Sequence, residues 1–259
     1  MRKNKLLLLI ATLSVLFLVM PLIMIAITAF GSAPIIQFPI QGFTFKWFSK
    51  VLASKSLMTS LITSLRLALI ASVLGILIAL PTSYALSKRK DKISKALLSY
   101  FLSPSLIPGV VMGYALFKTL TLTFRLTVMS SLVLGHLLIV LPYSIRLIAA
   151  QLSDFDESIE EAAKSLGAKP FKAYVLVVLP SLKGAILAAF MMSFINSFNN
   201  LPVSLFLKGP GVNTLPAALM SHMEYNFDPS VSALSLMLMI GTLVMMILME
   251  WATRHKESI

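Results

Sequence analysis

The sequence contains no cysteine among its 259 residues. This absence excludes disulfide bonds, thiolate metal sites and a cysteine nucleophile. Charged residues are also scarce, at 12% of the chain, whereas soluble globular domains usually carry about 25%. Hydrophobic residues make up 58%. A soluble domain of this size could not bury so much apolar surface, so the composition indicates a membrane protein.

The apolar residues are gathered in six stretches, each close to the roughly 20 residues that a membrane-spanning helix needs. The first stretch follows a basic start and resembles a signal peptide, but it is longer than a cleavable core of about 7 to 15 residues, so we interpret it as a retained span. We therefore predict a single all-α membrane domain over residues 1–259. Its predicted spans are residues 6–30, 59–86, 96–117, 127–150, 183–207 and 231–251.

Acidic residues are few, 10 against 22 lysines and arginines, which gives a net charge of +12. In a soluble protein this charge would suggest nucleic-acid binding. Six spans, however, place 15 basic residues on the side of the termini and 6 on the other, with Arg66 inside a span. Basic residues concentrate on the cytoplasmic side of membrane proteins. The charge therefore predicts that both termini are cytoplasmic, and we expect no nucleic-acid partner.

Two of the predicted spans contain unusual residues: the third contains helix-breaking residues, and the fourth contains a histidine. Pro104, Pro108, Gly109 and Gly113 predict that the third span is broken. His136 lies in the fourth span without another histidine or acid at ligand spacing. We expect it to be a hydrogen-bonded interior residue rather than a metal ligand, and we predict no metal site.

One polar segment, within the predicted cytoplasmic loop 151–182, interrupts this apolar chain. Asp154 and Glu157 have the spacing of a capping box, which predicts a helix that begins near Phe155. Gly167 stands where a left-handed residue ends a helix, and Pro170 suits the first position of a second helix. Pro180 should stop or kink that second helix. The pattern predicts a helix, a glycine turn and a second helix.

The first of these two helices has two different faces. The small and apolar residues recur at helical spacing, while acids and a lysine fill the other face. Such a surface could dock another protein, or it could be an ordinary solvated loop. The apolar face consists of Ile159, Ala162, Ala163 and Leu166, and the polar face consists of Glu157, Glu160, Glu161 and Lys164.

The run EEAAKSLGAKPFKAYVLVVLP, residues 160–180, resembles the EAA loop of permease subunits of bacterial ABC importers. LPYSIR at 141–146, FNNLPVSLFLKGPGVNTLP and FDPSVSALS are similar to the spermidine/putrescine-type branch. The resemblance implies the type I importer fold, a location in the bacterial inner membrane and a loop that couples to an ATPase. The residues assigned to this coupling are Glu160, Glu161, Ala162, Ala163, Gly167, Leu179 and Pro180.

The resemblance also implies the partners. These are a cytoplasmic ATPase dimer, a second permease subunit of a different chain, an extracytoplasmic substrate-binding protein and the surrounding lipid. The chain itself has no G-x-x-x-x-G-K-[ST] phosphate-binding loop. We therefore expect no cofactor here, with ATP and Mg²⁺ held by the ATPase.

Two sets of residues are candidates for handling the solute. The fifth span and its exit combine aromatic rings with amides, which could line a conduit for a small cation or could simply pack helices. The acids of the last outer loop could help to seat the binding protein. The two sets are Phe194, Asn196, Phe198, Asn199 and Asn200, and Glu224 and Asp228.

Three functions remain open from the sequence. The favoured one is an ABC importer permease for a polyamine, which by resemblance would carry an acidic residue where Asn199 and Asn200 stand. The same machinery could move another small organic solute, such as an amino-acid derivative or an organophosphonate. An ion-coupled secondary transporter would need acids buried in the spans, which are nearly devoid of them. We find no catalytic constellation, and the chain is predicted not to be an enzyme.

Overall fold

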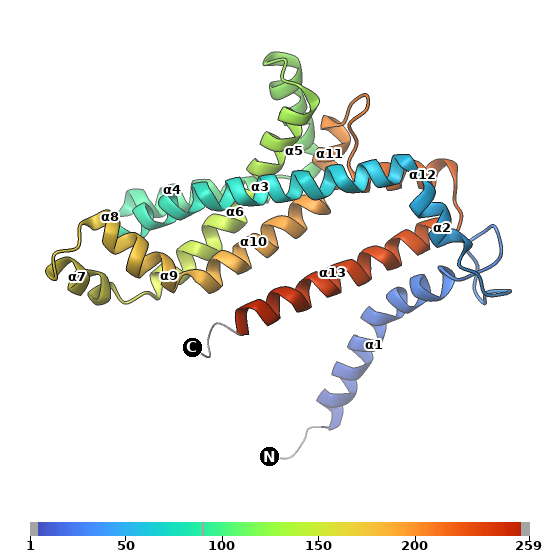
Figure 1. Cartoon of the computed structure of the whole chain (residues 1–259), viewed down its shortest axis with the longest axis horizontal. Coiled ribbons are helices and arrows are strands. Elements are labelled where there is room, and N and C mark those ends of the chain that lie inside the picture. The colour runs from blue at the N-terminus through green and yellow to red at the C-terminus, as the bar shows by residue number, and fades with distance from the viewer. Residues whose placement is uncertain (1–4, 90, 255–259) are drawn as a thin grey trace. The chain divides into compact units, whose positions relative to one another are not determined.

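The computed structural model describes residues 5–89 and 91–254, and these are almost entirely helical (Figure 1). Within the described ranges there is no β-strand, and extended pairing is limited to two isolated bridges, Gly31 with Phe43 and Gly209 with Val212. The chain divides into two compact units, one formed by Thr59–Ala217 and the other by Met1–Met58 with Ala218–Ile259. The all-helical prediction is confirmed.

The unit that contains both ends of the chain is built on α13, which packs against α1 and α2. The hydroxyl of Thr28 on α1 donates to Ser232 Oγ on α13 at 3.0 Å. Trp47 Nε1 on α2 donates to the carbonyl of Gly31 at 2.6 Å, which ties α2 to the end of α1. The helices are α1 (Lys5–Thr28), α2 (Lys46–Ala53), α13 (Ser230–Arg254) and most of α12 (Leu215–Tyr225).

The larger unit is organised around α6, which packs along α10 (Figure 1). Small hydroxyl residues join its helices, as expected where apolar side chains gain little by leaving lipid. Ser144 on α6 meets Ser193 on α10 at 2.8 Å, and Ser83 on α3 donates to the carbonyl of Ile145 at 3.3 Å. Its helices are α3 (Lys55–Lys88, which begins in the other unit), α4 (Lys92–Leu102), η1 (Ser103–Leu106), α5 (Gly109–Leu116), η2 (Phe117–Thr123), α6 (Val128–Ser153), α7 (Glu157–Ser165), α8 (Pro170–Ala173), η3 (Tyr174–Val178), α9 (Leu179–Ser181), α10 (Lys183–Phe198) and α11 (Leu201–Leu207).

Three helices of the described chain are long and apolar enough to cross a membrane: Leu7–Thr28, Lys55–Lys88 and Val128–Ser153. A fourth crossing follows if Pro170–Ser181 and Lys183–Phe198, which meet at a bend of 69°, form one span. The other apolar helices, Gly109–Thr123 and Ser230–Val244, are shorter. Within the described residues six full-length spanning helices are not observed, so the predicted count of six spans is not confirmed.

The third predicted stretch, 96–117, is broken as its prolines and glycines predicted. The α4 helix ends at Leu102, a 3₁₀ turn follows, and α5 begins at Gly109. Gly113 on α5 lies against α11, where an added Cβ would lie 2.7 Å from the ring of Phe206 and 3.0 Å from the carbonyl of Pro202. The glycine therefore permits a close approach that a side chain would block.

The fifth predicted stretch, 183–207, is not one continuous helix. The α10 helix ends at Phe198, and α11 begins at Leu201. Asn200 caps α11, because its Oδ1 accepts from the amide of Val203 at 3.1 Å. Pro202, in the first turn of α11, has no amide hydrogen to continue the preceding helix.

Candidate functional site

The polar segment forms a helical hairpin, residues 157–181, which we call the α7–α9 hairpin. Its first helix begins at Glu157 and not near Phe155, and its cap is Asp156, whose Oδ1 accepts from the amide of Ser158 at 2.9 Å. The predicted cap, Asp154, instead terminates α6. The prediction failed because α6 extends to Ser153, beyond the end of its apolar run.

Gly167 makes the turn of the hairpin, as predicted. Its φ of 92° is in the left-handed region, which favours glycine. The amide of Ala168 donates to the carbonyl of Ala163 at 3.1 Å, and the amide of Gly167 donates to the carbonyl of Lys164 at 2.9 Å. These two bonds form a Schellman motif, which satisfies carbonyls at the end of α7. Pro170 is the first residue of α8, also as predicted.

The second half of the hairpin changes its winding before it reaches α10. A π-helical turn, η3, follows α8, and Pro180 then lies in the short helix α9. The chain bends by 69° between Pro170–Ser181 and Lys183–Phe198. The break expected at Pro180 is therefore observed about two residues later, at Leu182, the residue between these two segments. Leu179 is half-buried, while Pro180 is exposed.

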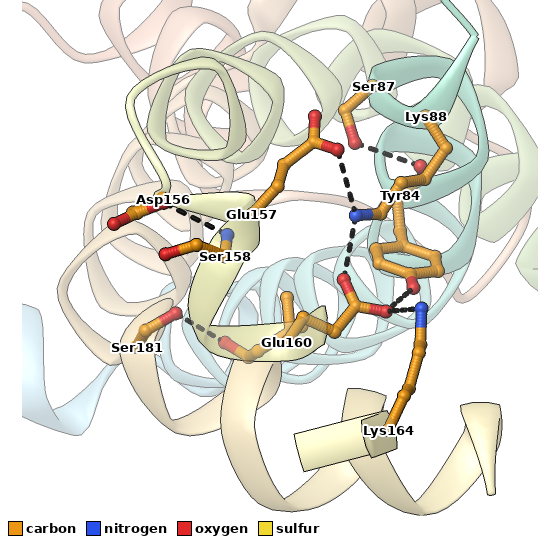
Figure 2. A network of polar contacts seen from close by, with 10 residues as sticks. Tyr84, Ser87, Lys88, Asp156, Glu157, Ser158, Glu160, Lys164 and Ser181 are labelled. Atoms are coloured by element: carbon orange, nitrogen blue, oxygen red, sulfur yellow. Dashed lines mark hydrogen bonds and ion pairs between the residues drawn. The ribbon is translucent and has the colours of Figure 1, made fainter. Parts of the chain in front are cut away.

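The side chain of Glu160 is completely buried and receives three polar groups (Figure 2). Lys88 Nζ lies 2.7 Å from its Oε2, Lys164 Nζ lies 2.6 Å from its Oε1, and Tyr84 OH donates to Oε1 at 2.6 Å. Lys88 also lies 3.5 Å from Glu157 Oε2. Tyr84 and Lys88 belong to the last turns of α3, so this network fastens the hairpin to α3.

The network keeps Glu160 ionised. Burial by itself would raise the pKa of Glu160, but hydrogen bonds from Lys164, Lys88 and Tyr84 outweigh this effect and lower the pKa to about 2. Glu160 therefore points into this chain and is an internal attachment of the hairpin.

The opposite face of the hairpin is exposed and mixed in chemistry. Leu166 is 90% exposed and Phe171 is 78% exposed, far more than large apolar side chains in the interior of this unit. Glu161 and Ala162 are also exposed, and Ala163 is half-buried. An exposed apolar surface beside a carboxylate is suited to bind another protein. We call Glu161, Ala162, Leu166 and Phe171 the outer face of the hairpin.

The candidate pathway residues lie at the end of α10 and the break after it. The rings of Phe190, Phe194 and Phe198 stack in a row, with 6.0 Å between successive centroids. Phe194 is buried, and Phe198 is half-buried. The row therefore follows one side of α10 up to its last residue.

The three asparagines have different surroundings. Asn196 donates from Nδ2 to the carbonyl of Met192 in its own helix at 2.9 Å. Asn200 caps α11, as described above, whereas Asn199 is exposed at the end of α10. Two of the three amides therefore have local backbone partners, and Asn199 is the one most available to a solute.

His136 on α6 contacts both helices that flank the break, α10 and α11. Its Nδ1 lies 2.8 Å from Ser197 Oγ on α10, and its Nε2 lies 3.1 Å from Ser204 Oγ on α11. The imidazole is only 1% exposed. The predicted interior, hydrogen-bonded role of His136 is confirmed, and the two serines identify it as a bridge between helices.

Glu224 and Asp228 lie in the other unit, and their surroundings differ. Asp228 forms an ion pair with Lys50 and accepts a hydrogen bond from the amide of Ser230 at 3.0 Å. Burial raises its pKa, but the bonds from Lys50 and Ser230 outweigh burial and lower the pKa of Asp228 below its ordinary value. Glu224 is exposed. Glu224 is therefore the more accessible of the two acids to a partner.

Sequence reasoning missed Tyr84 and Lys88 as members of the hairpin site. Lys88 had one available signal, because it begins the densest basic run of the chain on the same predicted side as the acidic hairpin. Tyr84 had none, since a tyrosine near the end of an apolar span is also typical of a membrane interface.

Comparisons with known proteins agree with this architecture. The family described as "Binding-protein-dependent transport system inner membrane component" matches residues 71–257. The spermidine/putrescine transport system permease protein PotC of Escherichia coli (strain K12) is 29% identical over 93% of this chain and 91% of its own length. The putrescine transport system permease protein PotI of the same organism is 33% identical over 41% of this chain and 38% of its own length.

The fold is also found in a solved structure. A chain in the crystal structure of a bacterial ABC transporter involved in the import of the acidic polysaccharide alginate superimposes with a TM-score of 0.68 and 17% identity, covering 96% of this chain and 97% of that one. This likeness concerns the fold, while the match over residues 71–257 includes most of the sequence. The chain therefore belongs to the family of binding-protein-dependent transport system inner membrane components, and it is a permease subunit of an ABC importer.

Proposed function

We propose that this permease moves a polyamine, spermidine or putrescine, across the bacterial inner membrane. The observation that carries the proposal is the likeness to PotC, which extends over nearly the full length of both chains. The likeness to PotI supports the same branch. A row of stacked phenylalanines that ends beside an exposed amide, Asn199, is compatible with a small organic cation, because cations are attracted to aromatic faces.

In the proposed assembly this chain works with three other kinds of protein subunit and is surrounded by lipid. A cytoplasmic ATPase dimer hydrolyses ATP with Mg²⁺, since this chain has no phosphate-binding loop. A second permease of a different sequence completes the pathway. A substrate-binding protein delivers the solute from outside, with Glu224 as a contact, and lipid surrounds the spans.

The proposed topology has six crossings and both termini in the cytoplasm. The distribution of lysine and arginine, 15 against 6, supports this orientation. The broken stretch from α4 to η2, α10 together with the short α11 that follows it, and α13 supply the three crossings that are not long straight helices. In this topology the α7–α9 hairpin lies in the cytoplasm.

In this arrangement the outer face of the hairpin docks on the ATPase. Leu166 and Phe171 supply apolar area, Ala162 permits close approach, and Glu161 meets a basic group of the partner. Gly167 sets the turn that presents these side chains. Glu160, which is buried, holds the hairpin in place from the inside.

One observation favours a second candidate solute class. The resemblance to polyamine permeases leads us to expect an acid near the end of α10, where Asn199 and Asn200 stand. Amides are neutral and serve as donors and acceptors alike. An amino-acid derivative or an organophosphonate is the alternative solute for the same machinery.

The test uses the complex purified from native membranes through a tag on this chain. We expect an ATPase, a second permease and a binding protein to copurify, and proteoliposomes with ATP inside to take up spermidine or putrescine. A thermal-shift screen of the binding protein against both polyamines, amino acids and an aminophosphonate identifies the solute class. Polyamine binding supports the proposal. Stabilisation by another class alone would contradict it.

A further inference from the structure

We propose that α3 carries the movement of the α7–α9 hairpin across the membrane, and that the buried Glu160 network is the joint through which it does so. The inference rests on the proposed coupling function of the hairpin. It assigns Tyr84 and Lys88 as positioning residues for transport, although both are remote from the outer face of the hairpin.

The joint holds both halves of the hairpin. Lys88 and the hydroxyl of Tyr84 hold Glu160 on α7 (Figure 2). The ring of Tyr84 also lies 4.5 Å, between centroids, from the ring of Tyr174 in η3. Tyr84 and Lys88 are four residues apart, so they lie on one face of α3. A displacement of the hairpin therefore acts on α3 through a charge pair, a hydrogen bond and a ring contact together.

The α3 helix is long enough to carry that displacement to the other side. It is continuous to Lys88, and the 21 residues from Ser64 to Tyr84 span about 30 Å, the thickness of the hydrocarbon core. Near the far end, the hydroxyl of Ser64 accepts a hydrogen bond from the amide of Leu215 at 2.7 Å. Thus α3 has polar attachments at both ends.

The covalent route from the hairpin to α10 is less direct. It passes through the π-helical turn η3 and the 69° bend before Lys183. A bend and a change of winding interrupt the continuous helical path between the hairpin and α10. Pro81 removes one backbone bond within α3, but the neighbouring Ser83 ties the helix to the carbonyl of Ile145 on α6. Of the two routes, α3 is the continuous one.

Pairs of spin labels separate the two routes in the intact complex. The chain has no native cysteine, so introduced cysteines are its only labelling sites. One pair joins Ser158 on α7 to Thr59 on α3, and the other joins Ser158 to Met192 on α10, all of them exposed in this chain. On ATP binding we expect the first distance to stay constant and the second to change by about 2–5 Å. The opposite result would overturn the inference.

Substitution of Lys88 tests the joint itself. In Lys88→Met we expect the Ser158–Thr59 distance distribution to broaden and the solute taken up per ATP hydrolysed to fall about tenfold, within the usual range of coupling energies. Lys88→Arg keeps the charge and should restore both values. Lys92→Met, which removes an exposed lysine of the same basic run, is the matched control and should leave both unchanged.

These outcomes separate the inference from the proposed function. If the wild-type complex couples ATP to uptake but Lys88→Met retains the wild-type ratio of solute to ATP, the α3 joint is wrong while the coupling hairpin stands. If the wild-type chain copurifies with no ATPase, the proposed coupling function itself fails. A Lys88→Met chain that does not assemble is replaced by Tyr84→Phe, which removes only the hydroxyl bond to Glu160 and is expected to broaden the same distance distribution.

Discussion

At the scale of single residues, Gly167 determines the turn of the hairpin through its backbone alone. An added Cβ would meet no atom within 4 Å, so space does not require a glycine there. The requirement comes from φ, which at 92° strains residues that carry a side chain. Substitutions at this position therefore report on backbone conformation without a contribution from steric overlap.

We predict that Gly167→Val uncouples transport while Gly167→Asn largely preserves it. A β-branched residue in the left-handed region costs about 1–3 kcal/mol, whereas asparagine tolerates that region. The measurements are solute uptake and binding-protein-stimulated ATPase activity in proteoliposomes. Equal activity of the two variants would show that the left-handed turn is unnecessary for coupling.

The sequence predicted Gly167 but not the role of Glu160, and the reason is physical. A left-handed turn leaves a local signature, a glycine after a helix and a proline three residues later. A buried carboxylate is recognised only through its partners, and Lys88 and Tyr84 are more than 70 residues away in the sequence. Helical spacing alone placed Glu160 on the polar face, and polar faces are usually solvated.

At the scale of elements, the break between α10 and α11 is the feature that apolar length concealed. A largely apolar stretch of 25 residues, 183–207, suggested one span, whereas Asn200 and Pro202 start a new helix within it. In the third stretch, 96–117, the break could be predicted from the sequence, because two prolines and two glycines stand close together there. His136 then bridges the two helices, which the sequence predicted only as an interior hydrogen bond.

We predict that His136 positions the end of α10 and the start of α11 for transport. In His136→Asn the side-chain amide would replace Nδ1 and keep the bond to Ser197. In His136→Gln the amide would replace Nε2 and keep the bond to Ser204, whereas His136→Phe would keep neither bond. Each interhelical bond contributes about 0.6–2 kcal/mol in membranes, so His136→Phe should lose about 1–4 kcal/mol of stability.

The measurement is the maximal rate of uptake together with the solute concentration at half-maximal rate. A positioning role predicts that both change most in His136→Phe and less in the two amide variants. If His136→Phe lowered only the amount of assembled complex, with unchanged kinetics per complex, the residue would be required for folding and not for positioning.

At the scale of the whole molecule, the orientation is the property on which the proposed cytoplasmic hairpin depends. The net charge of +12 is explained by sidedness if the loops alternate as proposed. Three of the six proposed crossings are not single long helices, because only three helices of the described chain are long and apolar enough to span alone. The broken stretch between Lys92 and Lys118 decides whether the alternation holds.

We predict that single cysteines introduced into this cysteine-free chain alternate in their access to a membrane-impermeant maleimide. Glu224→Cys and Lys118→Cys should react in intact spheroplasts, whereas Ser158→Cys and Lys92→Cys should react only after the membrane is permeabilised. All four positions are exposed within the chain, so a difference in labelling reports the membrane and not burial. If Lys118→Cys were labelled only from the inside, the chain from α4 to η2 would enter and leave on one side. The number of crossings would then fall by one and the hairpin would lie outside. If Ser158→Cys still required permeabilisation, α6 would not cross either, and the number would fall by two.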